Sequence, residues 1–152
     1  VEHSTLTTTD LHEPKGVAAA NAGELYVANG AGSGAWTAHN NKVYLFVTIP
    51  NISTASSGWV ACPVAGTISK IQSIINAVIS GADATITSEI NTTLVTAGGM
   101  TIAYSGSAVG DVDTATPSGA KTVAVGDKIE IITDGGSTGT CIGNFTIEIT
   151  PS

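Results

Sequence analysis

Ala84-Thr85-Ile86-Thr87-Ser88-Glu89-Ile90 alternates apolar and polar side chains along its length. Successive side chains of a β-strand point to opposite faces, so this stretch predicts a strand with one dry face and one wet face. Met100-Thr101-Ile102-Ala103-Tyr104 alternates in the same way. Strands of this kind are typical of antiparallel sheets that cover a core with one face.

The β signal extends in both directions from these two segments. Lys42–Ile49 is β-branched and aromatic and stops at Pro50. Turn signals such as Gly98-Gly99 and Gly135-Gly136 separate the later segments. The expected strands are Lys42–Ile49, Trp59–Val64, Gly66–Ile79, Ala84–Ile90, Met100–Tyr104, Thr122–Val125, Lys128–Thr133 and Cys141–Ile149. About eight short strands with frequent turns predict an all-β fold, a β-sandwich or jelly-roll-like domain over residues 41–152.

Lys70–Ile79 has a competing interpretation as a helix. Its isoleucines and valine also match a period of 3.6 residues. We favour a strand, because the segment is rich in Ile and Val and lies between Gly66 and Gly81.

Residues 1–40 read differently and predict an extended N-terminal arm. Leu25, Val27 and Trp36 flank the turn signal Asn29-Gly30, which indicates a small hairpin. The segment carries too little apolar surface to fold alone, so we expect it to gain order by lying on another surface.

Charge excludes one class of partner. Charged residues make up 11% of the chain, against about 25% in a typical globular domain. All five basic residues are lysine, there is no arginine, and the net charge is −7. This composition argues against a nucleic-acid-binding surface.

Membrane insertion and cleaved export are not expected. No apolar run approaches the roughly 18 residues that a membrane span needs. The start Val1-Glu2-His3-Ser4 has no basic or apolar region of a signal peptide. We therefore expect synthesis in a cytoplasm without a cleaved signal.

Cys62 and Cys141 lie in apolar, strand-like sequence. Two buried free thiols that act as small hydrophobes are the favoured interpretation, and a disulfide bridge is the alternative.

No pattern of reactive side chains predicts catalysis, a cofactor or a metal. His3, His12 and His39 lack a second ligand at zinc spacing. Asp111-Val112-Asp113 could hold Ca²⁺ in a loop, but the rest of an EF-hand is missing and the neighbours favour an ordinary turn. We expect a protein that is not an enzyme.

Two stretches carry a resemblance to known proteins. Asp10–Val17, followed by Gly23–Trp36, resembles a segment near the amino end of small structural proteins of tailed bacteriophages. Pro63–Ile71, Ser105–Val112 and Val125–Ile131 are similar to parts of β-sandwich domains in phage head-decoration and fibre proteins.

The resemblance implies a virion component, a capsid decoration or cement protein on the outer surface of the capsid that binds and stabilises the shell of major capsid protein. Such proteins are often trimeric, and synthesis is then expected in the host bacterial cytoplasm. The arm is expected to attach the protein to the capsid. Its candidate contact residues are Leu11, His12, Glu13, Pro14, Lys15, Val17, Leu25, Tyr26, Val27 and Trp36.

Other functions remain open at this point. The main alternative is a phage head or tail fibre module that binds a host surface or a glycan. That function needs a cluster of exposed aromatic or carboxylate side chains, for which the candidates are Trp59, Tyr104, Asp111 and Asp113. A non-viral adhesin or pilus-type subunit is a further alternative.

Overall fold

The computed structural model describes residues 24–28, 34–38 and 41–152. The chain divides into two compact units, Val1–Asn40 and Asn41–Ser152. The described part of the first unit is an antiparallel hairpin of β1 (Glu24–Ala28) and β2 (Gly34–Ala38). The predicted hairpin is therefore present, and its connecting turn lies outside the described residues.

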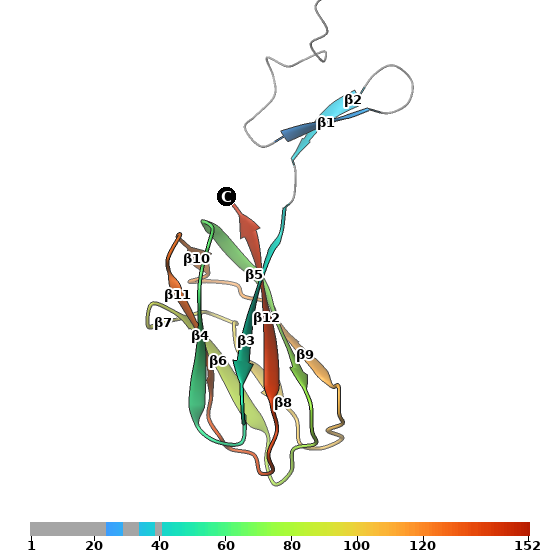
Figure 1. Ribbon diagram of the computed structural model, residues 1–152, viewed down its shortest axis with the longest axis vertical. Coiled ribbons are helices and arrows are strands. Elements are labelled where there is room, and N and C mark those ends of the chain that lie inside the picture. The colour runs from blue at the N-terminus through green and yellow to red at the C-terminus, as the bar shows by residue number, and fades with distance from the viewer. Residues whose placement is uncertain (1–23, 29–33, 39–40) are drawn as a thin grey trace, which may run out of the picture. The chain divides into compact units, whose positions relative to one another are not determined.

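The second unit consists of two antiparallel five-stranded sheets that face each other (Figure 1). The first sheet has the order β10-β5-β12-β3, with β9 also paired to β5. The second has the order β4-β11-β6-β7, with β8 also paired to β6. The strands of the first sheet are β3 (Val43–Ile49), β5 (Gly66–Ile75), β9 (Val112–Ala115), β10 (Thr122–Val123) and β12 (Gly143–Pro151). Those of the second are β4 (Ser56–Ala61), β6 (Ala84–Ile90), β7 (Thr93–Leu94), β8 (Met100–Ile102) and β11 (Lys128–Thr133).

The strands of this unit pair in a nested order. β3 pairs with β12, β4 with β11, and β5 with β10, so early strands meet late ones. Successive pairs alternate between the two sheets, as in a long two-stranded ribbon rolled upon itself. This is the double Greek-key connectivity of a jelly roll. The all-β, jelly-roll-like fold expected from the sequence is confirmed.

The core of the jelly roll is built mainly from isoleucine. On β6, Ile86 and Ile90 point inward with exposures of 1% and 7%, as the alternation predicted. Ser88 occupies the inward position between them and is fully buried, and its hydroxyl donates a 2.9 Å hydrogen bond to the Gly98 carbonyl. A buried hydroxyl with a partner avoids the cost of an unsatisfied polar group. The largest fully buried side chains are Phe145, Ile49, Ile52, Ile68, Ile71, Ile75, Ile79, Ile86, Ile102, Ile129, Ile131 and Ile147.

The segment with two interpretations forms a strand, but a shorter one than expected. β5 ends at Ile75, so the predicted extension to Ile79 is wrong. Asn76 ends the ladder, because its side-chain oxygen accepts a 2.7 Å hydrogen bond from the Ile142 amide. Ile79 is nevertheless buried, and its amide donates to the Ser107 hydroxyl.

Two strands have no counterpart in the predicted set. β7 is a two-residue strand after a tight turn. β9 begins at Val112, so the turn expected around Asp111 is present, with the Asp111 amide bonded to the Ala108 carbonyl, but it does not extend to Val112 and Asp113. Its residues pair with Ile71–Ile74 of β5, which lie far away in the sequence. The other differences are shifts of strand ends by a few residues.

The turn between β6 and β7 contains a strained threonine. Asn91 and Thr92 have φ angles of 48° and 74°, in the left-handed region that β-branched residues avoid. We expect Thr92→Gly to raise the free energy of unfolding by about 1 kcal/mol, because relief of strain exceeds the extra chain entropy of glycine. Thermal unfolding should shift upward by about 2–4 °C. Thr93→Gly, in the adjoining strand β7, is the control and should destabilise; an unchanged or lower midpoint for Thr92→Gly would contradict the strain.

Candidate functional site

The hairpin of the N-terminal unit presents one aromatic face. Tyr26 and Trp36 are direct cross-strand partners, and their rings meet edge to face with centroids 5.3 Å apart and an interplanar angle of 64°. Such pairs stabilise an antiparallel ladder, by about 0.2–1 kcal/mol relative to two alanines. The aromatic pair therefore stabilises the register in which the two strands are paired.

The opposite face of the hairpin carries exposed aliphatic side chains. Leu25 opposes Thr37, and Val27 opposes Ala35. Leu25 and Val27 remain 51% and 55% exposed. All three residues named for the predicted hairpin therefore lie on it, and the period of two along a strand places Trp36 with Tyr26 on the face opposite Leu25 and Val27.

The indole of Trp36 adds a polar requirement. Its Nε1–H is buried, and the described residues offer it no hydrogen-bond acceptor. A buried donor without a partner costs about 1–3 kcal/mol. This nitrogen has no accessible surface, so the hairpin offers a partner its exposed apolar side chains rather than this donor.

The remaining predicted arm residues lie outside the described part of the chain. They are Leu11, His12, Glu13, Pro14, Lys15 and Val17. Their proposed role in attachment stays a prediction.

In the jelly roll, the carboxylates of Asp111 and Asp113 line one small hollow of about 140 Å³. Asp111 already accepts a 2.6 Å hydrogen bond from the Ala108 amide. Burial raises the pKa of Asp113, and the neighbouring Asp111 charge adds to the rise. Within the ranges that the structure describes, no group of three or more His, Cys, Asp or Glu side chains gathers as metal ligands would.

The two cysteines are buried free thiols, as expected. Cys62 Sγ lies 3.1 Å from the Val64 carbonyl oxygen and Cys141 Sγ lies 3.2 Å from that of Ala77. Each thiol is thus placed as a small apolar group with a weak local hydrogen bond.

The four side chains that the fibre alternative needed do not form one cluster. Trp59 lies on β4 of the second sheet, 58% exposed, and opposes Glu130. Tyr104 follows β8, where its amide donates to the Asp83 carboxylate. Neither residue lines the hollow of Asp111 and Asp113.

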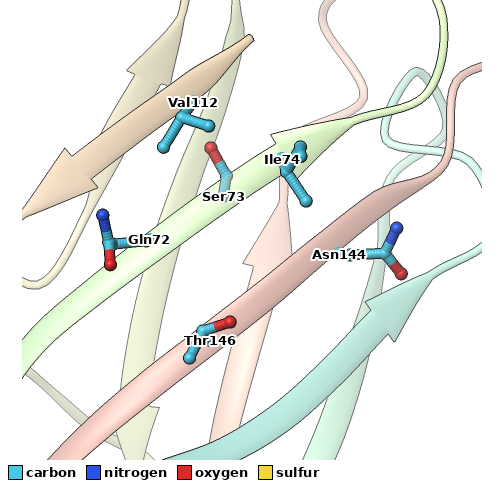
Figure 2. A pocket seen from close by; sticks show the side chains of 6 residues that line it. All are labelled: Gln72, Ser73, Ile74, Val112, Asn144 and Thr146. Carbon is cyan, nitrogen blue, oxygen red and sulfur yellow. The ribbon is translucent and has the colours of Figure 1, made fainter. Parts of the chain in front are cut away.

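A different surface was missed by sequence reasoning. Strand β3 turns Tyr44 and Phe46 outward, with exposures of 51% and 71%. The adjacent strands contribute the amides and hydroxyl of Gln72, Asn144 and Thr146, which line a shallow hollow of about 240 Å³ (Figure 2). The alternation of Lys42–Ile49 could have placed both aromatic residues outward, but the neighbours come from strands about 30 and 100 residues away along the chain.

The sequence matches no known family and no curated protein. Among the described residues, there is no helix with the length and apolar character to span a membrane.

Proposed function

We propose that this protein is a structural component of a bacteriophage virion, a capsid decoration protein that attaches through its N-terminal hairpin. The observation that carries the proposal is the exposed pair Leu25 and Val27 on a two-stranded hairpin. An isolated hairpin is marginally stable in water, so one with apolar side chains on both faces gains stability by packing on a partner. The resemblance of the arm to phage structural proteins supplies the identity of the partner, the major capsid protein.

The jelly roll supports this role as a self-contained module. All of the buried core residues in the described ranges lie between Leu45 and Ile149, within the second unit. A core contained within one unit does not require the arm for its packing, which supports a separate role of the arm in attachment. Jelly rolls occur in both viral coat proteins and lectins, so the fold by itself does not select the function.

The proposal includes self-association into trimers. Several linked copies turn weak individual contacts into tight attachment, because the later contacts form at high effective concentration. Light scattering should then give a mass three times that of the 15.1-kDa chain. A monomer at micromolar concentration would contradict the trimer.

The attachment is tested with Leu25→Ser/Val27→Ser and purified heads of the encoding phage, assembled without this protein. About half of each side chain is available for burial, worth roughly 1 kcal/mol each. The double variant should bind about thirtyfold more weakly per contact, measured by co-sedimentation. Its thermal unfolding should match the wild type, since the core lies in the other unit.

Val109→Ser/Val125→Ser is the matched control, because both valines are 70% exposed on the jelly roll. It should bind heads normally. Failure of the wild type to bind heads would refute the decoration role. Normal binding by the Leu25→Ser/Val27→Ser variant would refute attachment through the hairpin.

A further inference from the structure

The outer surface of the first sheet brings together uncharged side chains from four strands. Two neighbouring rows cross β3, β12, β5 and β9 in register. We call these eight positions the neutral face. They are Thr48, Asn144, Ile74 and Val112 in one row and Phe46, Thr146, Gln72 and Thr114 in the other.

The neutral face contains no ionisable side chain, although the chain carries a net charge of −7. The next row includes Glu148 and Lys70, which form an ion pair, and Glu148 also pairs with Lys42. On the outer surface of the second sheet, by contrast, the row that starts at Trp59 continues through Glu130 to Glu89. The absence of ionisable side chains makes the neutral face suitable for an uncharged ligand.

The polar groups of this face are held in defined positions. Thr48 Oγ1 donates a 2.9 Å hydrogen bond to Asn144 Oδ1. This bond fixes the orientation of the Asn144 amide and leaves its NH₂ group as a donor for other acceptors. Gln72 Nε2 donates to Thr114 Oγ1 at 3.3 Å, which leaves the Gln72 carbonyl oxygen as an acceptor. The Thr146 hydroxyl lies between these strands and can both donate and accept (Figure 2).

Phe46 supplies the aromatic part of the surface, in addition to the exposed aliphatic side chains of Ile74 and Val112 that also line the hollow. Phe46 is the direct cross-strand neighbour of Thr146, and 71% of it is exposed to solvent. Tyr44 precedes Phe46 by two positions, so it lies on the same face of β3, and it is 51% exposed. Exposed aromatic rings beside fixed donors and acceptors match a pyranose, which has an apolar C–H face and an edge of hydroxyl groups.

We propose that the neutral face is a binding site for uncharged oligosaccharides. The hollow lined by Gln72, Asn144 and Thr146 would receive the hydroxyl edge of one sugar, and Phe46 would stack on the C–H face of the next. An anionic glycan is disfavoured, since the nearest lysines, Lys42 and Lys70, already pair with Glu148. Binding is shallow, so a single site should bind with a Kd of about 0.1–1 mM. Sugar binding by this face is independent of the attachment proposed for the hairpin.

The test uses the full-length protein in an NMR titration with maltohexaose, cellohexaose, mannohexaose and N-acetylated chitohexaose, with hyaluronan as the acidic comparison. At least one neutral hexasaccharide should give saturable shifts at Gln72, Asn144 and Thr146, with little change between low and high salt. Phe46→Ser should weaken this binding at least tenfold. Trp59→Ser, which removes an exposed aromatic side chain from the other sheet, is the matched control and should bind normally.

Several outcomes would overturn the proposal. These are the absence of saturable shifts with all neutral sugars at 10 mM, preference for hyaluronan, or undiminished binding by a folded Phe46→Ser protein. Light scattering tests whether the neutral face instead mediates self-association. Loss of wild-type self-association in Phe46→Ser would assign the face to contact between copies of the chain and would refute a free sugar site.

Discussion

Phe145→Ala is expected to lower the free energy of unfolding by about 3–5 kcal/mol, the largest effect of any single substitution discussed for this chain. Phe145 is 1% exposed and lies on β12, which pairs with β3 on one side and β5 on the other. It is the one aromatic residue among the buried core side chains of the described part. Truncation therefore removes the largest apolar volume and leaves a cavity between the sheets.

Close packing limits how far this cavity can collapse. A Cβ atom at Gly143 would lie 2.9 Å from Phe145 Cε2 and 2.6 Å from Ile52 Cγ2, so the ring is already in contact with its neighbours. Interiors packed to this density relax only in part, and the lost contacts are not recovered. Phe145→Leu, which keeps most of the volume, should cost clearly less than Phe145→Ala.

The change in the free energy of unfolding is measured by urea denaturation, with the same m-value for all variants. Phe46→Ala is the control, because the same residue type on the neighbouring strand β3 is 71% exposed and should change stability by at most about 0.5 kcal/mol. Equal losses for Phe46→Ala and Phe145→Ala would mean that the burial of Phe145 does not stabilise the jelly roll.

The second large effect concerns Glu148, a carboxylate that is only 8% exposed. Lys42 Nζ donates a hydrogen bond to Glu148 Oε1, Ser69 Oγ donates to the same oxygen at 2.7 Å, and Lys70 Nζ lies 4.0 Å from Oε2. Ser69 can reach the carboxylate because of a β-bulge: Lys70 opposes Glu148 whereas Ile68 opposes Ile149.

These contacts lower the pKa of Glu148, chiefly through the hydrogen bond from Lys42 and then that from Ser69. A carboxyl with a lower pKa in the folded state stabilises the fold above its unfolded pKa, near 4.5, and loses that contribution as the pH falls through the folded value. Glu148→Gln should therefore cost about 1–2 kcal/mol at pH 7. The cost should shrink as the pH is lowered from 5 to 3, where the wild-type carboxyl also becomes neutral.

The measurement is the difference between the two stability curves from pH 7 to pH 3. Hydrogen bonds also lower the pKa values of Asp127, Glu130 and Asp134, so both proteins lose stability in acid, and only their difference reports Glu148. A double-mutant cycle with Lys42→Met checks the cause, since the two substitutions should not be additive. A difference that stays constant with pH, or full additivity, would contradict the role of this pair.

The two candidate sites differ in how much of each could be predicted from the local sequence. The turn signal and flanking apolar residues were sufficient for the hairpin of Glu24–Ala38, because both strands are close in the sequence. The pairing of Tyr26 with Trp36 was not predicted. The sequence did not specify the register of the two strands, and a shift by one residue would move side chains from one face to the other. The neutral face was missed altogether, since Phe46, Gln72 and Thr146 lie on three segments that only strand pairing brings together.

Alternation along the sequence determined the all-β class and the dry face of strands such as Ala84–Ile90, because burial on one side of a sheet requires a period of two. Only the tertiary structure decided that β3 pairs with β12 and that Val112–Ala115 forms a strand beside β5. The physical reason is that alternation states which side chains turn inward without stating which strand lies next to them. Partners are selected by packing over the whole core, and β-strand preference depends on that context more than on the residues themselves.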